Sequence, residues 1–349
     1  MSTDAANLAA LHAAIRPLAP LLHAPETEDL AIQKPGEGWH LKHGAWHRVE
    51  LPSMSYNRLY GLSVLAASQT RQRISPRAPI LSADLPGGLR LESLMPPAVP
   101  SGTMALCIRR GDETVDEIKD VPRLYGTSRW NKWNERHERR RAQERALLEP
   151  YDAGDIEAWL HAVVASRKTG LFCGPTGAGK SRLSRLLGGA IAADERIITI
   201  EDVAELVIRQ PNHVRLFFPA GGENGRLTPE RLMKAALRQR PSRILLGEMR
   251  SPDTAWVFLD EVMAGHPGSL STIHGSTPGE AARRLFNYVK ASETGRMMQD
   301  HTIVAQLSNT IDFIMPVEND RGRRDIAEVW FRPAVERDGK SFADLLEEP

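Results

Sequence analysis

The chain has 349 residues, of which 41% are hydrophobic and 26% are charged. This length exceeds that of one ordinary domain, and the composition is typical of a soluble globular protein. The formal net charge of +1 argues against an electrostatic nucleic-acid binder, so any basic surface has to be local. Cys107 and Cys173 lie far apart within apolar runs, which favours two buried thiols over a disulfide.

The first 23 residues are rich in alanine and leucine. Asp4, His12 and Arg16 interrupt the apolar positions, and no positively charged segment precedes them, which argues against a signal peptide and a membrane span. We predict an amphipathic helix here. Because no later stretch has an apolar run long enough to cross a bilayer, any membrane association is expected to be peripheral.

From residue 29 to residue 110, short apolar runs alternate with turn signals such as Pro86-Gly87-Gly88, and a helix is expected over residues 57–69. This spacing predicts that residues 1–110 form an α+β domain built on an antiparallel sheet. Three histidines fall on a predicted hairpin, where solvated polar positions are expected rather than a metal site. They are His40, His43 and His47.

The segment 111–154 loses apolar periodicity and gains charge, which predicts a linker. An arginine-rich helical run through Arg145 should end at Pro150. Trp130 and Trp133 would lie one turn apart on that helix. The linker is either a plain solvated spacer or a surface whose tryptophans dock on another copy and whose arginines meet an acidic partner or anionic lipid.

Residues 155–349 alternate helices and strands in the manner of βαβ units around a parallel sheet. Compact apolar runs at 170–173, 196–200 and 242–247 predict buried parallel strands. The whole chain is therefore expected to be α/β, with a smaller α+β domain preceding a parallel-sheet domain.

The run at 170–173 leads into the pattern G-x-x-x-x-G-K-S, and an apolar-periodic helix follows it. The loop residues are Gly174, Pro175, Thr176, Gly177, Ala178, Gly179, Lys180 and Ser181. Glycines let the backbone N–H groups point at a phosphate, and the following helix adds its dipole. We expect Lys180 to reach the β- and γ-phosphates, Ser181 to hold Mg²⁺, and Arg182 to join the nucleotide-binding residues.

Acidic residues follow two further predicted strands: Glu201 and Asp202 the first, and Glu248 the second. The carboxyl ends of parallel strands meet at one edge of the sheet, so these acids should converge on the loop. We assign Glu248 the role of the Walker B acid and Glu201 a second catalytic role. Both are expected, with Ser181, to hold Mg²⁺ through the nucleotide or to orient the attacking water. Taken singly, each acid would more readily be interpreted as a helix N-cap or a member of a surface ion pair.

Two histidines flank a glycine-rich turn and a short β-run between residues 265 and 275. A neutral imidazole donates one hydrogen bond, so His266 and His274 are predicted to sense the γ-phosphate, with His274 also catalytic. A lone histidine at such a place is more often structural.

Four segments resemble, in order, the Walker A, Asp, Walker B and His boxes of the secretion-ATPase superfamily: 174–181, 199–206, 240–250 and 265–275. Within that superfamily, residues 211–214, Gly265-His266-Pro267-Gly268-Ser269 and residues 326–330 look most like the traffic ATPase of type IV secretion systems. The likeness is strong from about residue 169 to residue 330 and looser over residues 30–110. Three mild departures remove no functional group: Ala178, Ser181 and Gly275.

This resemblance implies a RecA-like C-terminal domain and a PAS-like N-terminal domain, stacked as two rings of a homohexamer with nucleotide between them. Arg90 and Arg109 occupy the places of arginines that meet the phosphates. The implied function is an ATPase that powers substrate transfer or pilus assembly, in conjugation or protein secretion. The implied location is cytoplasmic and peripheral to the bacterial inner membrane, with partners that include the coupling and assembly ATPases of the apparatus.

Three other functions fit parts of the pattern. A related pilus assembly or retraction ATPase has the same four boxes. A nucleic-acid translocase is disfavoured by the net charge and by the lack of an aromatic-basic stacking segment, so no sequence-specific nucleic-acid partner is expected. A small-molecule kinase would leave the paired histidines without a role.

Overall fold

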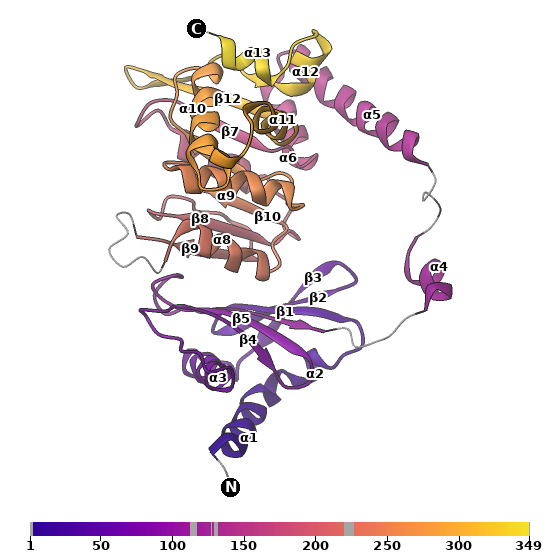
Figure 1. Cartoon of the computed structure of the whole chain (residues 1–349), viewed down its shortest axis with the longest axis vertical. Coiled ribbons are helices and arrows are strands. Elements are labelled where there is room, and N and C mark those ends of the chain that lie inside the picture. The colour runs from indigo at the N-terminus through magenta and orange to yellow at the C-terminus, as the bar shows by residue number, and fades with distance from the viewer. Residues whose placement is uncertain (1–2, 112–116, 127, 129–131, 220–226, 349) are drawn as a thin grey trace.

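The computed structural model describes residues 3–111, 117–126, 128, 132–219 and 227–348. Two sheets organise these residues, one in each half of the chain (Figure 1). The N-terminal sheet lies in the lower half of the view and the C-terminal sheet in the upper half, and the described helices between them in sequence, within residues 117–126 and 132–152, lie along one side.

The N-terminal sheet has six strands, each antiparallel to its neighbours, in the order β3-β2-β1-β6-β5-β4. Its strands are β1 (Thr27–Lys34), β2 (Gly36–Lys42), β3 (Ala45–Leu51), β4 (Ile80–Leu85), β5 (Leu89–Leu94) and β6 (Ala105–Arg110). Between β3 and β4 lies α3 (Tyr56–Gln69), which begins where the Ser55 hydroxyl accepts a hydrogen bond from the Arg58 N–H. The predicted antiparallel sheet with its helix is confirmed.

The N-terminal helical segment consists of α1 (Thr3–Ile15), η1 (Arg16–Leu18) and α2 (Ala19–Leu22). One stripe of it is buried in the N-terminal core, at Leu11, Ile15, Leu18 and Leu22. The stretch from Ala5 to Leu22 passes for a membrane span by length and composition alone, so the expectation that it is not one stays a prediction.

The three histidines of the β2–β3 hairpin have different surroundings. His43 and His47 are exposed, as expected of solvated positions, but His40 is buried and lies 2.6 Å from the hydroxyl of Thr27. The prediction of a solvated position is therefore wrong for His40, because the strand turns its side chain toward β1.

The linker contains η2 (Ile118–Asp120), α4 (Val121–Leu124) and α5 (Trp133–Asp152). The expectation that Pro150 ends the helix is wrong: the proline lies in the last turn, where its missing N–H costs one hydrogen bond, and α5 continues to Asp152. Leu147 is buried in the C-terminal core, so the end of α5 packs with the second half of the chain. Trp130 and the side chain of Trp133 lie outside the described residues.

The C-terminal sheet has eight strands in the order β13-β12-β7-β11-β10-β8-β9, with β14 also paired to β12. From β12 to β9 every pair is parallel, whereas β13 and β14 run antiparallel to β12. The strands are β7 (Gly170–Cys173), β8 (Ile197–Glu201), β9 (His213–Phe217), β10 (Arg243–Leu246), β11 (Leu270–Ile273), β12 (Phe313–Asp320), β13 (Arg323–Ile326) and β14 (Trp330–Phe331). The predicted parallel sheet is confirmed, and the α/β two-domain fold with it.

Helices cover both faces of this sheet. They are α6 (Ile156–Ala165), α7 (Lys180–Gly189), α8 (Pro229–Arg238), α9 (Pro252–Met263), α10 (Pro278–Ala291), η3 (Gly295–Met297), α11 (Asp300–Thr310), α12 (Arg332–Arg337) and α13 (Phe342–Glu347). Successive strand residues point to opposite faces, so Leu171 and Cys173 pack in one core and Phe172 in the other. Both cysteines, Cys107 and Cys173, are free and buried, as predicted.

The two halves meet along the edge strand β9, where the Phe217 N–H donates to the Ala98 carbonyl oxygen at 2.9 Å, and at the edge where the parallel strands of the C-terminal sheet begin. Arg196, directly before β8, is fully buried and donates to the side-chain oxygens of Gln33 at 3.2 Å and Asn212 at 2.6 Å. Its guanidinium also lies over the Trp46 ring, 5.3 Å from the centroid. Burial lowers the pKa of Arg196 to about 10, so the cation persists at neutral pH and ties the two halves together.

Candidate nucleotide-binding site

The G-x-x-x-x-G-K-S loop joins the end of β7 to the start of α7, as the sequence predicts. Two positions in this loop require glycine, one because a neighbouring atom is too close and the other because of its backbone conformation. A Cβ on Gly174 would lie 2.3 Å from the Val317 carbonyl oxygen, and Gly179 has a φ of 110°. Pro175, Thr176 and Gly177 form the exposed crest, and Ala178 is buried beneath it.

Lys180 is buried at the start of α7. Its Nζ donates to the carbonyl oxygens of Gly174 at 2.8 Å and Pro175 at 3.0 Å. Burial lowers the pKa of this ammonium group, whereas the charges of Glu248 and Glu205 raise it. The cation is therefore held inside the curl of the loop, beside two carboxylates.

Ser181 follows Lys180, and its hydroxyl donates to a carboxylate oxygen of Glu205. Glu205, in the loop after β8, is a site residue that was not predicted from the sequence. Its signal was present, because it stands four residues after Glu201 in the segment that resembles the Asp box.

Glu201, at the end of β8, is 1% exposed and has its carboxylate fully engaged by its own chain. One oxygen accepts from the N–H groups of Glu205 at 2.7 Å and Leu206 at 2.6 Å. The other accepts from the Thr199 hydroxyl at 3.1 Å and from Arg215 at 3.3 Å. These bonds fix the loop that presents Glu205.

Glu248, after β10, faces His274, after β11, with 3.0 Å between Oε1 and Nε2. Its other oxygen accepts from Arg250 at 2.8 Å, and Arg250 also pairs with Asp202. The carboxyl ends of β7, β8, β10 and β11 thus deliver the loop, the acids and one histidine to a single edge, as predicted.

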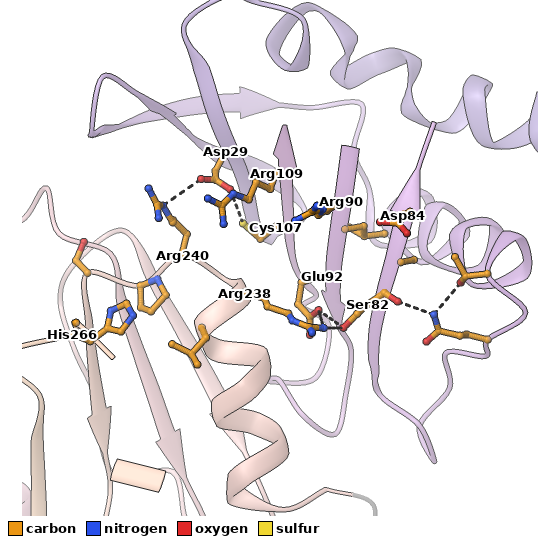
Figure 2. Close-up of a pocket in the computed structure, with 18 of the residues that line it drawn as sticks. Asp29, Ser82, Asp84, Arg90, Glu92, Cys107, Arg109, Arg238, Arg240 and His266 are labelled. Carbon is orange, nitrogen blue, oxygen red and sulfur yellow. Dashed lines mark hydrogen bonds and ion pairs between the residues drawn. The ribbon is translucent and has the colours of Figure 1, made fainter. Parts of the chain in front are cut away.

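Arg90, Arg109 and His266 lie elsewhere. They line a cavity of about 950 Å³ between the two halves of the chain, together with Arg238 and Arg240 (Figure 2). From the C-terminal half, the cavity is lined by the end of α8 and by residues that directly precede three strands: Arg167 before β7, residues 240–242 before β10, and residues 265–266 before β11. The cavity therefore lies at the amino ends of these strands. Within one chain, therefore, the structure does not bring Arg90, Arg109 or His266 to the phosphate loop.

His266 has its own structural partners at that edge. Its ring bonds to the Pro241 carbonyl, and its Nε2 lies 3.5 Å from Oε1 of Glu261. Burial lowers the pKa of His266 and raises that of Glu261 to about 8. Arg182, by contrast, stays near the loop and lines a smaller cavity with Gly179.

In this site a glycine loop encloses a lysine, and the neighbouring parallel strands supply carboxylates at the same edge of the sheet. This arrangement binds a triphosphate chain and hydrolyses it. The fold and this edge of the sheet define a P-loop nucleoside triphosphatase.

Comparisons with known proteins narrow the class. Residues 148–317 match the family model for type II/IV secretion system proteins. Protein VirB11 of Agrobacterium tumefaciens (strain 15955) is 44% identical over 333 residues, which cover 95% of this chain and 96% of that protein. Type IV secretion system protein VirB11 of Bartonella quintana is 32% identical over 332 residues, 93% of each chain. The crystal structure of the VirB11 ATPase from the Brucella suis type IV secretion system, in complex with sulphate, matches with a TM-score of 0.87 at 30% identity and covers 96% of this chain and 98% of that one.

The chain belongs to the VirB11 family of type IV secretion ATPases. The sequence-based prediction of that family and of ATPase activity is confirmed.

Proposed function

We propose that ATP binds with its phosphates on the backbone of residues 174–181 and on Arg182, and that Lys180 exchanges its two carbonyl partners for the β- and γ-phosphates. The buried position of this ammonium supports the assignment, because a phosphate is a stronger partner for a desolvated cation than a peptide carbonyl. In a glycine loop that opens a helix, backbone N–H groups can donate to phosphate oxygens.

Mg²⁺ is the cofactor that this site fits. Ser181 and Glu205 bring a hydroxyl and a carboxylate into contact, and hard oxygen donors of this kind suit Mg²⁺. The ion would neutralise charge that develops on the phosphates. Glu201, for which a direct role was predicted, acts instead as a positioning residue for Glu205, since one of its oxygens accepts from the loop N–H groups and the other from Thr199 and Arg215.

Glu248 and His274 are the proposed catalytic pair. Glu248 would orient the attacking water or the water molecules around Mg²⁺. His274, whose Nε2 lies 3.0 Å from Oε1 of Glu248, would sense the γ-phosphate. Arg250 and Asp202 hold Glu248 in place.

We further propose a homohexamer in which Arg90 and Arg109 reach the P-loop of a neighbouring copy. In one chain these arginines are on the opposite edge of the sheet from the loop, so a site that uses them needs a second copy. The proposed domains are residues 1–110 and 155–349, joined by 111–154. The relatives' printed names support a role in a type IV secretion system. We place the ring in the cytoplasm at the bacterial inner membrane, with the coupling and assembly ATPases of the apparatus as partners.

The observation that carries the ATPase proposal is Lys180 inside the loop. Lys180→Ala removes the charge that meets the phosphates, and the steady-state rate of ATP hydrolysis should fall at least about 100-fold. Circular dichroism and the melting temperature check that the variant is folded. Turnover within a few-fold of the parent protein would overturn the assignment.

A further inference from the structure

His213 is the first residue of β9, the strand at one edge of the C-terminal sheet, and it lies outside the proposed nucleotide site. Its Nε2 is 3.2 Å from the hydroxyl oxygen of Thr199 on the neighbouring strand β8. Thr199 is fully buried, and the same hydroxyl lies 3.1 Å from Oε1 of Glu201. The three side chains form one hydrogen-bonded row, which ends at the carboxyl end of β8.

The proton on each bond of this row follows from the chemistry of the three groups. An ionised carboxylate only accepts hydrogen bonds, so the Thr199 hydroxyl donates its single proton to Glu201. The hydroxyl oxygen must then accept from His213, whose Nε2 therefore carries a proton. Burial lowers the pKa of His213 to about 4, so at neutral pH the ring supplies this N–H without a positive charge.

The far end of the row supports the loop that presents Glu205. The second oxygen of Glu201 accepts from the N–H groups of Glu205 and Leu206, so a rotation of this carboxylate would disturb both bonds. Glu205 in turn accepts the hydroxyl proton of Ser181. Because that proton points at Glu205, the lone pairs of the Ser181 oxygen are left for a cation.

Arg215 also contacts Oε1 of Glu201, at 3.3 Å. Its side chain is 26% exposed, whereas the Thr199 hydroxyl comes from a fully buried residue on the same strand as Glu201. A short side chain on a central strand has less freedom to move than a long, partly exposed one. The orientation of the carboxylate therefore depends chiefly on Thr199.

We infer that Thr199 and His213 are positioning residues for the Mg²⁺ site, because they fix the Glu201 carboxylate and, through it, the placement of Glu205 against Ser181. This inference rests on the proposed function, in which Ser181 and Glu205 meet Mg²⁺. Its consequence is specific: loss of the row should weaken binding of the metal–nucleotide complex and spare binding of the nucleotide alone.

The test uses calorimetry with the non-hydrolysable ATP analogue AMP-PNP, once with Mg²⁺ and once with EDTA. Thr199→Val removes the hydroxyl and keeps the shape of the side chain. Its affinity for AMP-PNP with Mg²⁺ should fall about tenfold, in keeping with the loss of one hydrogen bond to a charged group. The affinity in EDTA should not change. Thr199→Ser keeps the hydroxyl, so it should retain the parent's affinity in both conditions.

His213→Phe is the second variant, since it removes the N–H donor at a partly buried position and keeps a ring. It should also weaken AMP-PNP binding only when Mg²⁺ is present. Because both residues act through one row, Thr199→Val with His213→Phe should bind no more weakly than Thr199→Val alone. Losses that add in the double variant would mean that His213 acts independently of Thr199, which overturns the row.

Thr310→Val is the matched control, because Thr310 is a buried threonine on α11 whose hydroxyl donates to the Gln306 carbonyl oxygen at 2.7 Å. It should change neither affinity. If Thr199→Val binds normally with Mg²⁺, or loses equally in Mg²⁺ and EDTA, the positioning role is overturned.

Glu205→Gln tests the proposed function separately. If it weakens AMP-PNP binding with Mg²⁺ and Thr199→Val does not, the Mg²⁺ site stands and only the inference fails. If Glu205→Gln has no effect, the assignment of Glu205 to the Mg²⁺ site fails, and the inference that depends on it fails as well.

Discussion

Three glutamates lie around the P-loop, and the groups that each one contacts indicate a different role for each. Glu201 is buried and satisfied by backbone and side-chain donors, whereas Glu205 meets Ser181 and Glu248 meets His274. A carboxylate whose oxygens are taken up by its own loop and by the neighbouring strands stabilises that loop. A carboxylate beside a P-loop hydroxyl or a histidine is placed to act on the nucleotide.

Glu248→Gln should therefore affect the rate of ATP hydrolysis, whereas Glu201→Gln should affect the free energy of unfolding. Glu248→Gln should keep nucleotide affinity and slow hydrolysis at least about 100-fold, since the amide keeps the shape but loses the charge. Glu201→Gln should lower the free energy of unfolding by about 1–3 kcal/mol, since a buried anionic acceptor of backbone N–H bonds is lost. ATPase rates and chemical denaturation of both variants check this. The reverse pattern would exchange the two roles.

Glu261 is buried in α9 near His266, and burial raises its pKa to about 8 from an ordinary value of 4.5. Between these pH values the folded chain holds a proton that the unfolded chain has released. The free energy of unfolding should therefore fall as pH rises from 4.5 to 8, by at most about 1.4 kcal/mol per pH unit from this group. Glu261→Gln should remove that slope, so its melting temperature should exceed the parent's at pH 8 and match it near pH 4.5.

At the scale of elements, local patterns predicted most of the fold. The strand, glycine loop and helix at 170–189 are contiguous in sequence, and the turn signals of the N-terminal half delimit its strands. The path of α5 through Pro150 was not predictable locally, because Leu147 and its neighbours are held by packing on the C-terminal core.

The edge on which a side chain lies depends on topology. His266 precedes β11 and His274 follows it, so a parallel strand separates them, although both belong to one sequence box. That signal was present in the sequence. The sequence held no such signal for the burial of His40, which depends on how the strands pair. It also held none for the distance of Arg90 and Arg109 from the loop, which depends on how the two halves pack.

β7 begins at Gly170, where a Cβ would lie 1.9 Å from Cζ of Phe313 on β12. Gly170→Ala should lower the free energy of unfolding by about 1–3 kcal/mol through overpacking. Denaturant titration measures this, and Phe313→Leu in the same chain should recover part of the loss. Gly189→Ala is the control, because nothing lies within 4 Å of its added Cβ. A fully stable Gly170→Ala would mean that the ring moves aside at no cost.

At the scale of the whole molecule, the proposed sharing of arginines between copies has a direct test. Mixing the inactive Lys180→Ala chain with an Arg90→Ala/Arg109→Ala chain should restore ATP hydrolysis. Some sites then combine an intact loop from one chain with intact arginines from the other. If each site used only its own chain's arginines, every site would carry one defect and the mixture would stay inactive. Subunit exchange is verified by native mass spectrometry of differently tagged chains.

The buried contacts of Arg196 also limit which homologous genes of such a family can recombine within the linker and still encode a stable chain. Gln33 and Trp46 come from the first half of the chain, whereas Arg196, Asn212 and Gln239 come from the second. Among the described residues, Arg196 has only neutral partners within hydrogen-bond distance. If one of these partners were lost, the guanidinium would remain buried with less compensation for its charge. A buried uncompensated charge costs several kcal/mol. A recombinant gene that crosses over within the linker would inherit the five residues from two parents. Such hybrids should therefore survive selection when the parents agree at all five positions, and the crossover point itself should matter less than that agreement.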